Sequence, residues 1–206
     1  VNYAGEIIHQ SFRDGTVFSE PQRIAKGLKA ALALDPAGRL HIAAVDFDTL
    51  PSRRARITER MLDQGAWSPS RTMAEMPIQI RRWEIVAIVD LLPDVHAFAA
   101  TSDGTARIVV SPSKILTLLS HASDAILAFS SDGKSVVIDS TGGRKLRGIS
   151  GSIDASGVIS CAFDAWRPSS HTQPMQDSLY FCSIDADMNV MRSTLLATDT
   201  LSFGNV

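Results

Sequence analysis

The chain has 206 residues, a formal net charge of -2, 45% hydrophobic residues and 20% charged residues, which is the composition of an ordinary globular protein. The near-neutral charge argues against a protein that binds nucleic acid through its electrostatic field, because such proteins carry a basic excess. No apolar run reaches the roughly 18 residues of a membrane span, so none is expected. The chain begins at Val1 without a signal-peptide pattern, so we expect a processed product or part of a longer protein.

The first predicted element is a β-hairpin over residues 6–24. Apolar and polar residues alternate along residues 6–12 and again along residues 16–24, which is the two-residue period of a strand. Asp14-Gly15 lies between the two runs. Asp-Gly is a strong hairpin signal because the turn needs positive φ, which glycine adopts without a Cβ clash.

A second hairpin is predicted around a turn at residues 35–38. Residues 30–34 form a continuous run of small apolar side chains, which predicts a strand buried on both faces. Residues 40–45 are the expected return strand. A strand over residues 55–62 and a turn at Asp63-Gln64-Gly65 follow, and Trp67 opens the next strand.

These elements suggest an internal repeat. Phe18 and Trp67 occupy matching places after a turn, and 67 minus 18 gives a period of about 50 residues. His41 and His96 lie in matching apolar strands, 55 residues apart (96 minus 41), which suggests packing or a hydrogen bond in each repeat. Periods of this length with four strands each predict propeller blades.

The second half of the chain repeats the same pattern of strands and turns less clearly. Asp103-Gly104 and Asp132-Gly133 are further turn signals, and no convincing amphipathic helix is present. The expected strands lie at residues 108–110, 115–119, 136–138, 146–149, 158–163 and 179–184, with two short ones within 190–203.

Two turns carry a family resemblance. Residues 11–18, Ser-Phe-Arg-Asp-Gly-Thr-Val-Phe, resemble the aspartate box of bacterial neuraminidase repeats, and residues 61–67 resemble it without the serine. Residues 35–41 are similar to the inner hairpin of the same repeat class. The resemblance is to the sialidase-like β-propeller superfamily, covers the first half of the chain best, and implies a structural role for the box.

The resemblance implies a role for each box residue. Asp14 and Asp63 would accept backbone hydrogen bonds, and Gly15 and Gly65 would take positive φ. Phe18 and Trp67 would pack between neighbouring sheets, with stacking on a sugar as the alternative role of Trp67.

Sialidase activity itself is not expected. That chemistry needs three arginines around the substrate carboxylate, a tyrosine nucleophile, a glutamate that activates it and an aspartate acid/base. Family sialidases also carry an Arg-x-Pro near the first blade, whereas this chain has only Tyr3 and Tyr180 and no such Arg-x-Pro. A general glycosidase needs only two suitably spaced carboxylates. The candidates at the ends of expected inner strands, which could equally be turn and strand-end caps, are Asp46, Asp48, Asp90, Asp94 and Asp164.

No metal site or cofactor is predicted. The five histidines show no paired spacing, and Asp185, Asp187 and Asn189 begin a calcium-loop pattern without its later glycine and glutamate. Cys161 and Cys182 are too few for a zinc site or a disulfide framework. They either pair across one hairpin or remain two buried thiols.

The sequence therefore predicts one all-β domain over residues 1–206. We expect a propeller-like array of about four to five four-stranded antiparallel blades, or part of a larger ring. The leading function is a non-catalytic binding or scaffold module, with a glycan or a protein as ligand at the mouth of the central channel. The alternative is a glycoside hydrolase with paired carboxylates in that channel. Oligomerisation and the cellular compartment stay open.

Overall fold

The structure is a computed structural model that describes residues 5–13, 16–17, 19–48, 54–77, 80–83, 86–89, 91–117, 120–140, 145–167 and 175–201. Every regular element in this part of the chain is a β-strand, and every pairing between strands is antiparallel, which confirms the predicted all-β class. None of the described residues belongs to a helix that could span a membrane.

The first sheet is an antiparallel meander of four long strands. They are β5 (Lys29–Leu34), β6 (Leu40–Asp48), β7 (Arg54–Asp63) and β9 (Arg71–Pro77), and the short β8 (Ala66–Trp67) also pairs with β7. The turn between β7 and β8 has Gln64 at φ 47° and Gly65 at φ 82°. Two successive positive φ values are the geometry of a tight hairpin turn that matches the strand twist.

Two further four-stranded meanders follow. The second sheet contains β12 (Leu91–Ala100), β13 (Ala106–Thr117), β15 (Ala125–Ser130) and β16 (Ser135–Ser140). The third contains β17 (Lys145–Ile153), β18 (Ile159–Arg167), β19 (Met175–Ile184) and β20 (Val190–Leu201). The short β14 (Ser120–Ser123) pairs with β13 and, at one position, with β17, so hydrogen bonds join these two sheets.

Three smaller strand pairs complete the described chain. β1 (Glu6–His9) pairs with β4 (Gln22–Lys26), and β2 (Phe12–Arg13) pairs with β3 (Thr16–Val17), so the predicted N-terminal hairpin is confirmed. Its turn residues, Asp14 and Gly15, lie outside the described residues. The third pair is β10 (Ile80–Trp83) with β11 (Val86–Val89).

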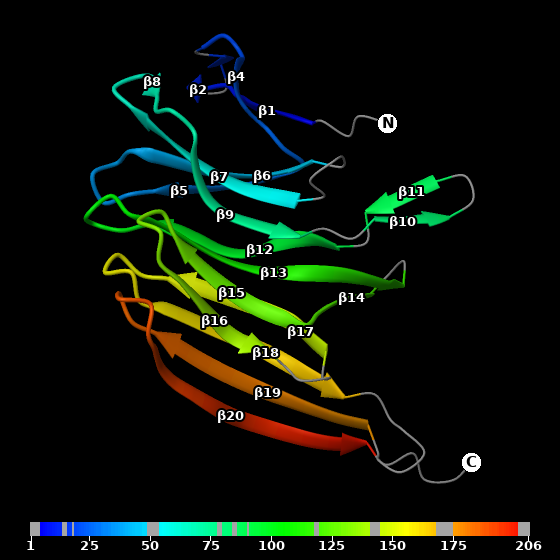
Figure 1. The fold of residues 1–206 in the computed structure, drawn as a ribbon. Helices are drawn as coiled ribbons and strands as arrows, with labels where there is room; N and C mark the ends of the chain where they lie inside the picture. Colours follow the sequence, from blue (N-terminus) through cyan, green and yellow to red (C-terminus); the bar gives the residue numbers. More distant parts are fainter. Residues whose placement is uncertain are drawn as a thin grey trace.

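The sheets are stacked one on the next in chain order, as Figure 1 shows from the blue to the red end of the ribbon. Two apolar cores lie between them, because alternate residues of a strand point to the same face. The core between the first and second sheets includes Val45, Ile57, Met76 and Ile108. The core between the second and third sheets includes Ile126, Leu146 and Phe163, and Phe163 stacks on Tyr180.

The first strands of the three sheets lie side by side. β5 lies next to β12, where Lys29 forms an ion pair with Asp94. β12 lies next to β17, where a Cβ on Gly151 would be 3.2 Å from the Cβ of Ala97.

The expected burial of residues 30–34 on both faces is wrong. Among the described strands, β5 pairs only with β6 and forms an edge of its sheet, and Leu32 is 63% exposed and Leu34 67% exposed. The alanines that alternate with them, Ala31 and Ala33, are half-buried. A continuous apolar run therefore did not indicate burial on both faces here, because every second apolar side chain of this edge strand is exposed.

The predicted equivalence of His41 and His96 within the repeat is also wrong. His41 lies in β6, the second strand of the first sheet, whereas His96 lies in β12, the first strand of the second sheet. β11 (Val86–Val89), which precedes the strand of His96, pairs with β10 rather than with that strand. The feature that does recur is a four-residue turn, in which the fourth N–H donates to the first carbonyl at 2.9 to 3.0 Å; its copies are residues 35–38, 101–104, 130–133, 154–157 and 185–188.

These turns connect neighbouring sheets. Ser102 donates from both its backbone N–H and its hydroxyl to the Ala155 carbonyl, at 3.1 and 2.8 Å. The buried Arg107 of β13 donates to the carbonyl of Gly157 and, at 2.6 Å, to that of Ala186, so one side chain reaches two turns of the third sheet. The turn end of the sheet stack is thus held by polar contacts in addition to the apolar cores.

Candidate functional site

A polar cleft lies at the turn end, between the first sheet and the first turn of the second sheet. Its volume is about 340 Å³. Pockets of this size are at the small end of those that take small-molecule ligands. The residues that line it are Arg39, His41, Glu59, Met61, Ser68, Pro69, Arg71, Asp103 and Gly104.

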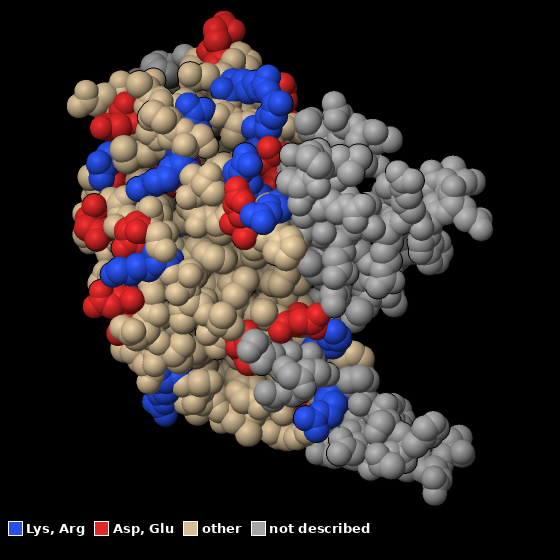
Figure 2. All heavy atoms as spheres, viewed as in Figure 1, with Lys and Arg blue, Asp and Glu red and all other residues tan. Residues whose placement is uncertain are grey.

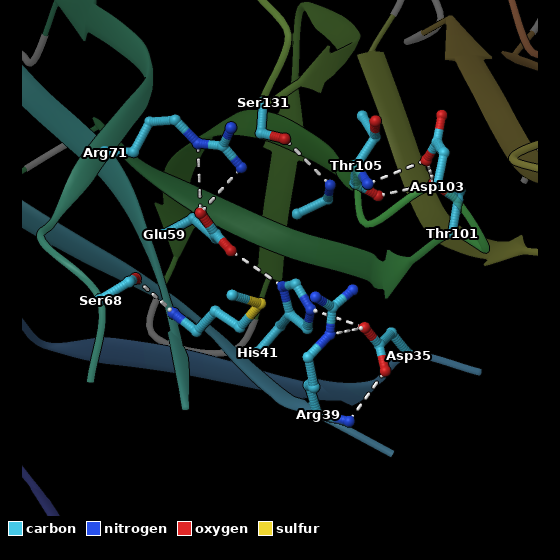
Figure 3. A network of polar contacts seen from close by, with 12 residues as sticks. Asp35, Arg39, His41, Glu59, Ser68, Arg71, Thr101, Asp103, Thr105 and Ser131 are labelled. Carbon is cyan, nitrogen blue, oxygen red and sulfur yellow. Dashed lines mark hydrogen bonds and ion pairs between the residues drawn. The ribbon is translucent and has the colours of Figure 1, made fainter. Parts of the chain in front are cut away.

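A buried histidine between two carboxylates forms the floor of the cleft (Figure 3). A hydrogen bond of 2.8 Å joins His41 Nδ1 to Glu59 Oε1, and all three of His41, Glu59 and Asp35 are at most 5% exposed. The other ring nitrogen of His41, Nε2, lies 3.5 Å from Asp35 Oδ2 and makes no hydrogen bond within the described chain. Buried carboxylates such as those of Asp35 and Glu59 are stable only when each has a partner.

Two arginines supply those partners and border the cleft. Arg71 donates from Nε and Nη2 to Glu59 Oε2, at 3.3 and 3.1 Å. Arg39 donates from Nε to Asp35 Oδ2 at 2.6 Å and from its backbone N–H to Asp35 Oδ1 at 2.8 Å. Burial would raise the pKa of Asp35, but these bonds from Arg39 outweigh it and hold that pKa below its ordinary value.

Each arginine is fixed through only part of its guanidinium. The side chain of Arg71 is 49% exposed and that of Arg39 is 32% exposed, whereas the carboxylates beneath them are enclosed. Arg39 Nη2 lies so close to the turn of the second sheet that a Cβ on Gly104 would be 3.1 Å away. Because a guanidinium carries five N–H donors, both arginines keep donors that face the cleft and solvent.

Asp103 provides an acceptor on the side of the cleft that belongs to the second sheet. Its Oδ1 accepts from the Thr101 hydroxyl and, at 2.9 Å, from the Thr105 backbone N–H. The hydrogen bond from Thr101, followed by those from Thr105, lowers the pKa of Asp103 to about 2. Asp103 is therefore ionised at neutral pH.

The charges of this site nearly cancel. Two guanidinium groups, of Arg39 and Arg71, face three carboxylates, of Asp35, Glu59 and Asp103. The cleft thus offers both donors and acceptors without a strong net field. Within the described residues, no group of three or more His, Cys, Asp or Glu side chains is arranged to hold a metal ion.

The three candidate aspartates whose side chains are described do not line this cleft. Asp46 lies in β6, Asp94 in β12 and Asp164 in β18, so the three described side chains belong to three different sheets. Asp94 forms an ion pair with Lys29, and Asp164 Oδ2 would be 2.9 Å from a Cβ on Gly148. Asp48 lies in β6 but its side chain is outside the described residues, as is all of Asp90.

The aspartate-box residues lie away from the floor of the cleft where they are described. Asp63 is exposed at the β7–β8 turn, and Gly65 takes positive φ there. Trp67 is half-buried and meets the His9 ring of β1 edge-on, at 5.5 Å between ring centroids. Phe18, like Asp14 and Gly15, is outside the described residues.

The two predicted histidines make different contacts. His41 belongs to the network above, whereas His96 Nε2 is 2.7 Å from the Ser111 hydroxyl oxygen. Burial lowers the pKa of His96, against smaller opposing effects of Asp94 and of a hydrogen bond to the Ile149 backbone. Both histidines are therefore hydrogen-bonded, although they are not structural equivalents.

Sequence reasoning missed Arg39, Glu59, Arg71 and Asp103. One signal for Glu59 was present, because the alternation Ala55, Ile57, Glu59 puts an acid at an inward position of β7. A charged residue in a buried register needs a buried partner. The identity of that partner depended on which strands pair with β7, and this is not readable locally.

Charged side chains elsewhere on the surface are mixed in sign. Figure 2 shows Lys and Arg interspersed with Asp and Glu over the described part of the viewed face. In the first sheet, Arg54 and Arg56 both pair with Glu75, at 3.0 and 3.3 Å. Exposed pairs of this kind contribute little to stability.

Comparisons with known proteins identify no family. No protein-family model matches the chain, and no curated protein matches it either. Among solved structures, the chain is similar to a crystal structure of a puromycin hydrolase mutant complexed with PGG, with a TM-score of 0.32 and 8% identity over 90% of this chain. The chain covers 31% of that protein's length, and a similarity this low carries no argument. The sialidase-like resemblance stays a prediction.

Proposed function

We propose that the chain is a non-catalytic binding module built from propeller-type blades, and that the turn-end cleft binds a neutral, hydroxyl-rich ligand such as the end of a glycan. The blade architecture is supported by three antiparallel four-stranded meanders, of which the second and third are joined through β14, with apolar cores between them and their first strands side by side. The cleft replaces the channel mouth as the proposed binding site.

One observation carries the ligand class: donors and acceptors surround the cleft in nearly balanced charge. Arg39 and Arg71 present N–H donors that their carboxylate partners do not use, and Asp103 presents an acceptor. A sugar hydroxyl both donates and accepts, so it matches such a lining. In the lining, Glu59 and Asp103 balance Arg39 and Arg71, and the buried Asp35 also pairs with Arg39, so the cleft offers an anionic ligand no net positive charge.

The buried network makes the site rigid in advance. Glu59 and Asp35 hold the two arginines from beneath, and His41 lies between the two carboxylates. A ligand then does not have to order these long side chains on binding, which reduces the entropic cost of the complex. Met61 and Pro69 add apolar surface to the lining.

The hydrolase alternative gains no specific support. The three described candidate aspartates lie on three sheets, and one of them is paired with Lys29. Incubation with chromogenic glycosides tests this alternative directly, and turnover that is abolished by Asp94→Asn or Asp164→Asn would favour it over the binding module.

The binding proposal is tested by calorimetric titration with a panel of neutral oligosaccharides and their uronate counterparts. We expect a neutral oligosaccharide to bind and its uronate counterpart to bind more weakly. Arg71→Lys keeps the charge above Glu59 but loses the planar fork, so it should weaken binding about tenfold or more, as lost charged hydrogen bonds do.

Arg54→Lys is the matched control. Arg54 lies on the same sheet and is also paired with a glutamate, but it is outside the cleft. Its substitution should leave affinity unchanged. The proposal fails if no oligosaccharide of the panel binds, or if Arg71→Lys and Arg54→Lys reduce affinity equally.

A further inference from the structure

Cys161 and Cys182 lie directly opposite each other in the third sheet. Cys161 is on β18 and Cys182 on β19, and the register pairs them between Ser160–Ser183 and Ala162–Phe181 without any shift. Both side chains are at most 1% exposed and belong to the core between the second and third sheets. They therefore lie on the same face of the same strand pair.

This placement fits the geometry of a disulfide. Directly opposed residues of antiparallel strands have Cα atoms roughly 4.5 to 5.5 Å apart, within the roughly 4.4 to 6.8 Å that disulfides span. Their Cβ atoms are about 4.5 to 5.5 Å apart, so a small approach of the two strands completes the bond. The chain has only these two cysteines, so neither has another partner within it.

We propose that Cys161 and Cys182 are a modification site, at which oxidation joins β18 to β19 through a cross-strand disulfide. With glutathione disulfide as the oxidant, one cysteine thiolate attacks a glutathione sulfur and releases one glutathione thiol. The second cysteine then attacks the resulting mixed disulfide and releases the other glutathione. Two cysteine thiols are oxidised, and one glutathione disulfide is reduced to two thiols.

The bond forms during folding rather than afterwards. Burial, and then the neighbouring Cys182, raise the pKa of Cys161 to about 12, and burial also raises the pKa of Cys182. The thiolate is the reacting species, so enclosed thiols of the folded chain react slowly. An unfolded or partly folded chain exposes both thiols at ordinary pKa values.

The experiment compares two ways of adding the oxidant. The reduced chain is refolded from urea with reduced and oxidised glutathione, and in parallel the same buffer is added to chain that is already folded. Samples are denatured, free thiols are alkylated, and mass spectrometry counts them. Cys182→Ala is the control. It leaves Cys161 as the only thiol, so any disulfide that this variant forms is with glutathione or with a second chain.

We expect the refolded sample to be a monomer with no free thiol and the prefolded sample to keep both. Oxidation should raise the urea midpoint by about 1 M, since closing a loop of this length stabilises a protein by roughly 3 kcal/mol. Two free thiols after refolding, or a glutathione adduct alone, would overturn the proposal. A disulfide that lowers the urea midpoint would also overturn it, because the bond would then not fit the native register.

Discussion

Gly157 provides a sharp test of how the turn end is held together. It is the last residue of the turn at residues 154–157, with φ +88°, and the guanidinium of Arg107 lies directly over it. A Cβ on Gly157 would be 2.5 Å from Arg107 Cζ and 2.6 Å from Nη1. Gly157→Ala therefore adds a steric contact to the conformational cost of positive φ.

Two costs add up in this variant. Positive φ costs an alanine about 1 to 2 kcal/mol relative to glycine. Displacing the buried Arg107 weakens its hydrogen bonds to the carbonyls of Gly157 and Ala186, each worth about 1.5 to 3 kcal/mol because the donor is charged. We expect the free energy of unfolding to fall by about 3 to 5 kcal/mol.

Gly133→Ala is the matched control. Gly133 closes the same kind of turn in the second sheet at φ +93°, but no atom lies within 4 Å of its ideal Cβ. It should lose only the conformational cost, about 1 to 2 kcal/mol. Urea unfolding followed by circular dichroism gives both values, and the difference between them isolates the contribution of Arg107.

Equal destabilisation of the two variants would refute the reasoning, because Arg107 would then move aside without loss. A double-mutant cycle with Arg107→Met gives a second check. The cost of Gly157→Ala should shrink in the Arg107→Met background, since the clash and the two hydrogen bonds are already gone. A cost that stays the same would exclude the proposed contact.

Trp67→Ala should lower the free energy of unfolding by about 2 to 4 kcal/mol, which is less than for a fully enclosed ring because Trp67 is half-buried against His9. Trp67→Phe keeps the edge contact, so it should retain most of the stability that Trp67→Ala loses in the same urea titration. Glu59→Gln should cost about 1.5 to 3 kcal/mol, because it weakens the charged hydrogen bonds that the buried Glu59 accepts while the half-exposed Arg71 stays solvated, and an unchanged urea midpoint would contradict that network. Asp103 has a folded pKa of about 2, below its ordinary 3.8, so its contribution is present above pH about 4 and is lost as pH falls through about 2. Asp103→Asn should therefore reduce the fall of the urea midpoint between pH about 4 and about 2. A fall identical to that of the wild type would contradict the lowered pKa of Asp103.

The sequence by itself determined the strands and many of the turns. Period-two alternation depends only on successive side chains pointing to opposite faces, so it identified β6, β7 and β18 without any knowledge of their partners. Asp-Gly and related pairs marked turns because positive φ is a local requirement, and Gly65, Gly104 and Gly133 do take it. These features are encoded within a few residues of one another.

Only the tertiary structure decided which strands form one sheet and which polar residues meet. Residues 30–34 look like a central strand, yet β5 is an edge, because its neighbours are set by pairings far along the chain. The sequence spacing of His41 and His96 suggested equivalence, but the sheet boundaries fall differently around them.

The candidate site shows the same limit. His41, Glu59 and Arg71 come from three strands of the first sheet, and Asp103 comes from a turn of the second. Their contacts exist only after the first sheet has formed and the second has stacked on it. Burial of Glu59 in that stack makes its charge require a partner, and this requirement depends on the assembled surroundings rather than on the residues adjacent in sequence.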